Sequence, residues 1–121
     1  MTAADTILLT GLEVRATVGI FDWEQQIEQT LRIDLEMAAD AEAAAASDRI
    51  EDTLDYKAVA KHTQEFIAAS RCALVETLAH RLAEELMREF GIRWLRLTLR
   101  KPGAVRGSRS VGVAIERGKR R

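Results

Sequence analysis

Cysteine and proline are almost missing from this chain of 121 residues, which contains one of each. The single cysteine, Cys72, excludes an internal disulfide and fits a reducing compartment. The N-terminus lacks the basic region and long apolar stretch of a secretory signal, and no hydrophobic run approaches the length of a membrane span. We therefore expect a cytoplasmic protein without a membrane partner.

An excess of charge of one sign is also missing. Lysine and arginine (18) nearly cancel aspartate and glutamate (19), so no overall field would recruit nucleic acid. The basic ending from Arg117 onward is the exception, and we expect residues 118–121 to form a solvated tail. A chain of this length buries one core, which predicts a single domain over residues 1–121, ordered from about residue 5 to residue 117.

Metal-binding and nucleotide-binding motifs are absent as well. Only two histidines occur, His62 and His80, and with Cys72 they do not have the spacing of a zinc site. No glycine-rich phosphate loop or nucleophile elbow is found. The sequence thus predicts neither a metal ion nor a cofactor.

Alternating hydrophobicity predicts strands in the first third of the chain. Apolar residues alternate with polar ones from Leu12 to Ile20 and again from Leu31 to Met37. Ile7 and Leu9 have the opposite parity, which predicts a β-bulge at Gly11.

Helical periodicity dominates the middle of the chain. One helix is expected after Asp55, a plausible N-cap, and should end near Ser70. A second has an apolar stripe from Leu74 to Phe90, followed by Gly91 where a C-terminal glycine belongs. The alanine run at residues 43–46 predicts only a short helical link.

Two more strands, Trp94–Arg100 and Ser110–Glu116, complete the pattern. The element order is ββααββ, which predicts an α+β domain with a four-stranded antiparallel sheet and two helices on one face. Charged side chains would project from the other face: Glu13, Arg15, Arg32, Asp34, Glu36, Arg96 and Arg100. Solvent could cover that face, or several copies could join edge to edge into a barrel with a charged lumen, the arrangement that we favour.

Four polar residues stand in settings that suggest chemistry. Lys101 occupies the register of a leucine at the end of a strand and precedes Pro102, which should end that strand. Glu76 interrupts an apolar helix start, Tyr56 is the only tyrosine, and Glu24 follows a tryptophan. Each also has a structural explanation. Lys101 could extend its amine into water, and Glu76 could complement the helix dipole. Tyr56 could be a helix-start residue with its hydroxyl group in water, and Glu24 could be an ordinary turn residue.

Together these residues belong to four longer stretches, "VGIFDWEQQIEQTLRIDLEM", "SDRIEDTLDYKAV", "ALVETLAHRLAEEL" and "LRLTLRKPGAVRGSRSVGVAIER". Their order and spacing resemble the dihydroneopterin aldolase family of folate biosynthesis over about residues 5–117. The resemblance implies the tunnelling fold, in which subunits form a tetrameric β-barrel ring and two rings may stack into an octamer. It implies no metal and no cofactor.

The same resemblance assigns roles to particular residues. Glu76 matches the anchor of the pterin ring, and Val75 with Thr53 and Leu54 of a neighbouring subunit match further pterin contacts. Lys101, Tyr56 and Glu24 match the residues around the reacting side chain. There Lys101 would be the base, Tyr56 the proton donor and relay, and Glu24 would position Lys101 or the substrate hydroxyls.

The implied reaction cleaves 7,8-dihydroneopterin into 6-hydroxymethyl-7,8-dihydropterin and glycolaldehyde by general acid and base catalysis. Two alternatives stay open at this stage. The same residues would permit epimerisation at C2′, as in a dihydroneopterin (triphosphate) epimerase. A pterin-binding ring without catalytic activity would also carry the anchor residue.

Overall fold

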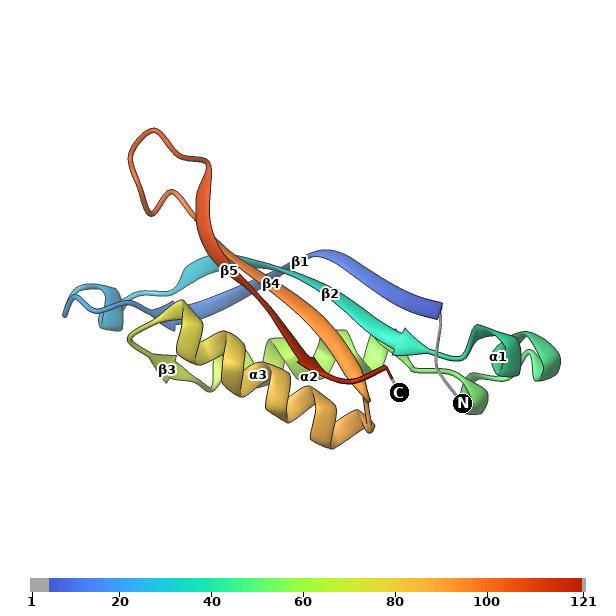
Figure 1. The fold of residues 1–121 in the computed structure, drawn as a ribbon. Helices are drawn as coiled ribbons and strands as arrows, with labels where there is room; N and C mark the ends of the chain where they lie inside the picture. Colours follow the sequence, from blue (N-terminus) through green and yellow to red (C-terminus); the bar gives the residue numbers. More distant parts are fainter. Residues whose placement is uncertain (1–4, 121) are drawn as a thin grey trace.

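The fold is a curled sheet covered on one face by two helices. The structure is a computed structural model and describes residues 5–120. The five strands have the spatial order β3-β1-β2-β4-β5. The elements in chain order are β1 (Asp5–Val18), the 3₁₀ turn η1 (Glu24–Gln26), β2 (Gln29–Ala39), α1 (Ala41–Ser47), the 3₁₀ turn η2 (Ile50–Asp52), α2 (Tyr56–Ala68), β3 (Arg71–Cys72), α3 (Val75–Phe90), β4 (Trp94–Pro102) and β5 (Ser110–Gly118). In Figure 1, α2 and α3 lie side by side on one face, with α1 at one end of the molecule and β3 at the other.

The core lies between the sheet and these two helices, where the predicted alternation places it. The buried side chains of β2 are Leu31, Ile33, Leu35 and Met37, and those of β4 are Leu95, Leu97 and Leu99. The ladder between β1 and β2 shifts register between Leu9 and Leu12, and Gly11 has a φ of 71°. The predicted bulge is therefore confirmed, and it reverses which parity of β1 faces the helices.

Both long helices begin and end where the sequence predicts. The Asp55 carboxylate accepts hydrogen bonds from the N–H groups of Lys57 and Ala58, which caps α2. Gly91 ends α3 in the left-handed conformation, and its N–H donates to the carbonyl of Met87.

The sequence missed the fifth strand. β3 has only two residues and pairs in parallel with the end of β1, through Thr17–Arg71 and Val18–Cys72. The prediction of four purely antiparallel strands is therefore wrong at this edge. Two residues are too few to show a periodic pattern, which explains why β3 could not be predicted.

β4 extends beyond its predicted range of Trp94–Arg100. Pro102 is its last residue, and it pairs with Ser110 of β5. The pairs between β4 and β2 already end at Arg100, so Pro102 lies where the sheet has only one neighbouring strand. A proline is tolerated there because β2 does not pair with this residue, so the N–H group that proline lacks is not needed for a bond to β2.

Residues 118–120 of the basic C-terminus make contacts with the rest of the chain. Gly118 belongs to β5, and the Lys119 N–H donates to the carbonyl of Arg93 at 2.9 Å. The Arg120 guanidinium lies 3.9 Å from the ring centroid of Trp94 and donates to Thr6 Oγ1 at 2.7 Å. Gly118 and Lys119 are exposed, whereas Arg120 is partly buried because arginine can stack on an aromatic ring, so a solvated tail stays a prediction. Arg121 lies outside the described residues.

The charged face of the sheet points away from the helices, as predicted. Its side chains pair across the strands: Arg32 with Glu13 at 3.5 Å, Arg96 with both Glu36 and Glu116 at 3.7 Å, and Arg100 with Asp34. Pairs of this kind are exposed and contribute little stability each. Within residues 5–120, the structure contains no helix of the length and apolar character that crossing a membrane requires.

Candidate active site

A pocket of about 220 Å³ lies at the end of the sheet that carries β3. It gathers side chains from the β1–β2 connection, the start of α3 and the end of β4. The lining residues are Val18, Gly19, Ile20, Glu24, Ala73, Leu74, Val75, Glu76, Lys101, Ala104 and Val111. Four of the seven residues singled out from the sequence therefore meet here: Glu24, Val75, Glu76 and Lys101.

An ion pair forms one wall of this pocket. Lys101 Nζ donates to Glu24 Oε2 at 2.5 Å, and the two side chains are 13% and 8% exposed. Lys101 continues the buried Leu95–Leu97–Leu99 face of β4 and reaches the pocket instead of snorkelling into water. The register of the strand thus aims a cation at a buried carboxylate.

The Glu24 carboxyl group is held in its ionised form. The hydrogen bond from Lys101 is the largest influence and lowers the pKa of Glu24 below its ordinary value, whereas burial opposes this shift. The Phe21 N–H donates to Glu24 Oε1 at 3.3 Å and lowers the pKa further, as does the side chain of Gln29. A buried, ionised carboxylate that accepts a hydrogen bond from Lys101 is consequently part of the pocket wall.

Gly19 creates the space that Glu24 occupies. A Cβ atom at residue 19 would lie 2.3 Å from Glu24 Cδ and 2.4 Å from its Oε1. The φ angle of Gly19 is also +147°, a conformation that residues with side chains rarely adopt. Any other residue here would both strain the backbone and displace the carboxylate.

Two glutamines fix the chain around Gly19. Gln25 Nε2 donates to the carbonyls of Gly19 at 2.6 Å and Cys72 at 3.3 Å, which ties the connection to β3. Gln29 Nε2 donates to the carbonyl of Val18 at 2.8 Å. Sequence reasoning missed these supporting residues, since a glutamine in a polar connection gives no signal of its partners.

Val75 and Glu76 form the first turn of α3. Leu74 precedes them and provides no side-chain cap, so first-turn N–H groups stay available beside the pocket. Glu76 is exposed and is the acidic residue of that turn. Its position satisfies the helix-dipole explanation and also places a carboxylate at the pocket rim.

The remaining predicted residues lie elsewhere in the chain. Tyr56 is the first residue of α2 and is 53% exposed, while Thr53 and Leu54 line a different pocket of about 600 Å³ beside the end of α3. These residues follow α1, at the opposite end of the molecule from β3 (Figure 1). A single chain therefore does not bring all seven residues together.

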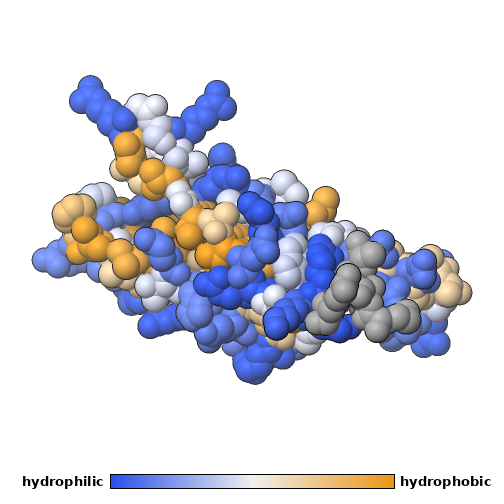
Figure 2. Space-filling view, viewed as in Figure 1, coloured by the Kyte–Doolittle hydropathy of each residue, from blue (hydrophilic) through white to orange (hydrophobic). Residues whose placement is uncertain are grey.

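Exposed hydrophobic side chains lie on the pocket lining at Ile20 and Leu74, and on the segments next to it at Phe21, Trp23 and Val105. Ile20, Phe21, Trp23, Leu74 and Val105 are each about half exposed or more, and the rings of Phe21 and Trp23 stack at 6.3 Å. Figure 2 shows hydrophobic surface on the connection between β1 and β2 and at the base of the β4–β5 loop. Apolar surface grouped in this way is typical of an interaction site.

Gly19→Ala should destabilise the fold by about 1–3 kcal/mol, the usual scale of a residue forced into a rare backbone conformation. Part of this cost comes from contact with Glu24, so it should shrink in a Glu24→Ala background, where most of that side chain is gone. Urea unfolding of the four proteins of this double-mutant cycle measures the coupling. Strictly additive effects would show that Gly19 does not make room for Glu24.

The pH dependence of stability should reveal the ion pair. Because the pKa of Glu24 is lowered below its ordinary value of 4.5, the pair stabilises the fold fully above that pH and loses its contribution as the pH falls through the lowered pKa. Lys101→Met removes the largest cause of the shift, so Glu24 should then titrate at a higher pH. Carbon-13 NMR of the carboxyl groups follows this titration, and identical curves for both proteins would contradict the pairing.

Comparison with known proteins identifies the family. The dihydroneopterin aldolase family model matches residues 7–116. Dihydroneopterin aldolase of Escherichia coli strain K12 is 45% identical over 114 residues, which cover 94% of this chain and 93% of the relative. The structure of the E. coli enzyme in complex with neopterin superposes with a TM-score of 0.91, at 45% identity and over 94% and 99% of the two chains. FolB from Vibrio cholerae O1 superposes with a TM-score of 0.92, at 48% identity and over 95% and 98%. Since these matches span almost the whole chain, the protein belongs to the dihydroneopterin aldolase family.

Proposed function

We propose that this protein is an aldolase that cleaves 7,8-dihydroneopterin into 6-hydroxymethyl-7,8-dihydropterin and glycolaldehyde. The observation that carries the proposal is the buried Glu24–Lys101 pair in a pocket whose rim holds Glu76. The name of the E. coli relative and the neopterin bound to its structure support the choice of substrate. The cytoplasmic location stays a prediction from the sequence.

Glu76 is the proposed anchor of the pterin ring. The aminopyrimidinone edge of a pterin offers two donors, the exocyclic amino group and a ring N–H. A carboxylate accepts both in a bidentate arrangement, which fixes the ring in its plane. Glu76 is exposed at the rim, and the adjacent Val75 backbone lies in the same turn of α3.

The substrate supplies its own electron acceptor. Its N5=C6 imine is conjugated to C1′, so the pair of electrons released when the C1′–C2′ bond breaks moves into the ring system. The enzyme has to remove the proton of the C2′ hydroxyl group and to protonate C1′ afterwards, and no other group needs to be transferred. Both steps are general acid and base catalysis.

Lys101 is the proposed base, acting directly or through a water molecule. When its amine takes the C2′ hydroxyl proton it becomes an ammonium, and the Glu24 carboxylate 2.5 Å away stabilises this product of the transfer. Glu24 also keeps Nζ pointing into the pocket. Tyr56 then delivers a proton to C1′, which restores the imine. The proton that Lys101 took returns to Tyr56, directly or through water, so that both residues regain their starting states.

A second copy of the chain would complete the site with Thr53, Leu54 and Tyr56. Within one molecule these residues lie at the opposite end from Lys101, so their contribution requires a neighbouring subunit. The hydrophobic rim of Ile20, Phe21, Trp23, Leu74 and Val105 suits such a contact. We infer a ring of four chains whose sheets close a barrel around the charged face, alone or stacked in pairs as an octamer.

Anaerobic incubation with 7,8-dihydroneopterin tests the proposed function directly. The expected result is equal amounts of glycolaldehyde and 6-hydroxymethyl-7,8-dihydropterin. Recombination at C2′ before release would add some dihydromonapterin. Dihydromonapterin as the only product would establish an epimerase, and binding without any product would establish a pterin-binding ring.

Lys101→Met and Glu76→Ala should separate catalysis from binding. Lys101→Met keeps the unbranched stem and should slow bond cleavage by roughly 10²-fold or more, with product affinity changed far less. Glu76→Ala should instead weaken pterin binding, by up to a few kcal/mol for a charge-assisted pair. Single-turnover quench and calorimetry measure the two effects. Wild-type cleavage in Lys101→Met would place the base at another residue.

Mixed oligomers should test whether two chains build one site. Lys101→Met and Tyr56→Phe should each be nearly inactive alone. In a mixed oligomer, a Tyr56→Phe subunit supplies an intact Lys101 and a neighbouring Lys101→Met subunit supplies an intact Tyr56, so the site between them is complete. Unfolding and refolding the two variants together should restore activity to roughly a quarter of wild type, the value for random assembly of two-chain sites. No recovery in oligomers of the wild-type size would assign both residues to the same chain.

A further inference from the structure

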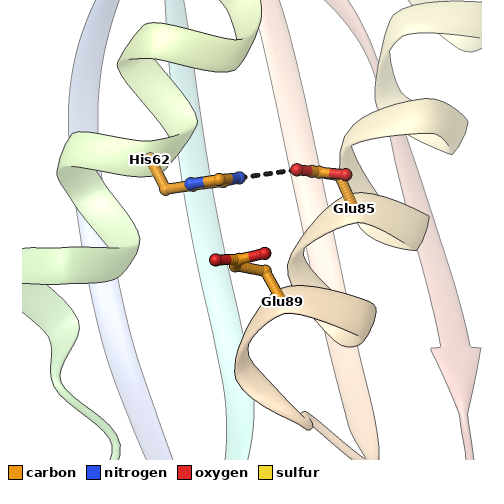
Figure 3. A group of neighbouring side chains, drawn as sticks. All are labelled: His62, Glu85 and Glu89. Carbon is orange, nitrogen blue, oxygen red and sulfur yellow. Dashed lines mark hydrogen bonds and ion pairs between the residues drawn. The ribbon is translucent and has the colours of Figure 1, made fainter.

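A histidine and two glutamates converge between α2 and α3, away from the pocket. His62 comes from α2, and Glu85 and Glu89 lie one turn apart on α3. His62 Nε2 lies 2.7 Å from Glu85 Oε2, and one potential ligand atom of each residue lies within 4.8 Å of the others. Figure 3 shows the three side chains pointing toward one another from the facing helices.

The surrounding contacts hold this cluster in place. The His62 ring meets Phe90 edge to face, with centroids 5.7 Å apart and an interplanar angle of 89°. The His62 and Glu85 side chains are only 28% and 20% exposed, so both have little freedom to turn away. Glu89 is exposed and can rotate toward the pair.

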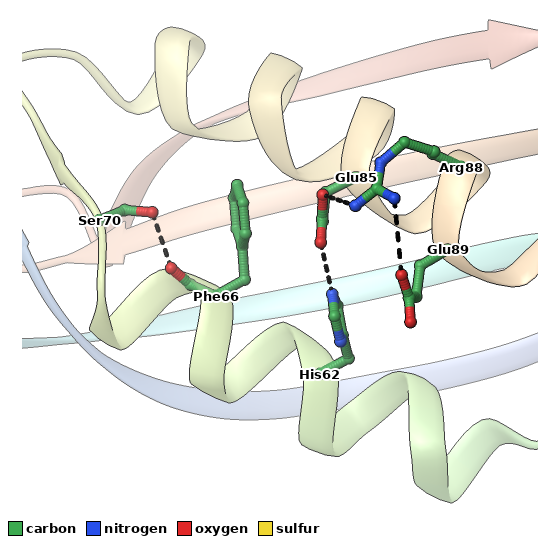
Figure 4. A network of polar contacts seen from close by, with 6 residues as sticks. All are labelled: His62, Phe66, Ser70, Glu85, Arg88 and Glu89. Atoms are coloured by element: carbon green, nitrogen blue, oxygen red, sulfur yellow. Dashed lines mark hydrogen bonds and ion pairs between the residues drawn. The ribbon is translucent and has the colours of Figure 1, made fainter.

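Arg88 is the competing cation. It donates to Glu85 Oε1 at 2.6 Å and lies 3.7 Å from Glu89 Oε2 (Figure 4). Two carboxylates share this one guanidinium, so the cluster retains a net negative charge whenever His62 is neutral. The Arg88 side chain is also 67% exposed, so it can move into solvent and leave the Glu85 carboxylate to the metal ion.

We propose that His62, Glu85 and Glu89 bind a divalent transition metal ion of the Zn²⁺ class. One imidazole nitrogen and two carboxylate oxygens form a ligand set that zinc accepts at distances of about 2.0–2.2 Å, with water completing the coordination. Closing the cluster to such distances requires rotation of Glu89 and loss of the Arg88 contacts. The ion would clamp α2 to α3, and it has no part in the proposed cleavage.

Zinc sulfate added to the full-length, chelator-treated protein tests the site. Calorimetry should give one site per chain, and the midpoint of thermal unfolding should rise by roughly 4 °C or more at about 100 times the Kd. Magnesium should have no such effect, because it prefers oxygen ligands. Absence of both zinc binding and a thermal shift would overturn the proposal.

Variants assign the ligands. His62→Gln and Glu89→Gln should each weaken zinc binding at least tenfold, whereas Arg88→Gln should tighten it. His80→Gln is the matched control, since His80 forms a similar 2.6 Å pair with Glu84 on α3 but belongs to no three-ligand cluster in the described residues. Unchanged affinity in both His62→Gln and Glu89→Gln, or loss of binding in His80→Gln, would refute the site. Because Glu89 is exposed, its variant keeps the test valid even if His62→Gln fails to fold.

Discussion

The burial of the Glu24 carboxylate is the constraint on which the rest of the site depends. A buried charge is tolerated only when it is paired and hydrogen-bonded. Glu24 accepts one hydrogen bond from Lys101, which is 77 positions away in the sequence, and another from the nearby Phe21 N–H. The pair therefore couples the β1–β2 connection to the end of β4, and it can form only because Gly19 leaves room for the carboxylate.

Much of the fold could be predicted because each long element has a clear periodic pattern. The alternating leucines of β4 predicted its buried face, and the same parity singled out Lys101, although the sequence left open whether it points into water or inward. Helix α3 was equally clear, since an apolar stripe ends at a glycine with the expected left-handed conformation. The opposite parities within β1 were enough to locate the bulge at Gly11.

Features that depend on contacts between distant residues could not be predicted. β3 exists because its two residues lie beside the end of β1, and Arg120 contacts Trp94 and Thr6, which are far from it in the sequence. Gln25 supports the pocket through the Cys72 carbonyl, 47 positions away. His62 and Glu85 are 23 positions apart, so no metal-ligand spacing marks their cluster.

The central claim is that two copies of the chain complete a catalytic site around the Glu24–Lys101 pair. A crystal structure of this protein with a bound pterin tests it most directly. The account predicts that both oxygens of Glu76 bind the pterin ring, that the substrate side chain lies near Lys101, and that Tyr56 comes from the adjacent subunit. A pterin bound elsewhere, or a site without any residue of a second chain, would contradict it.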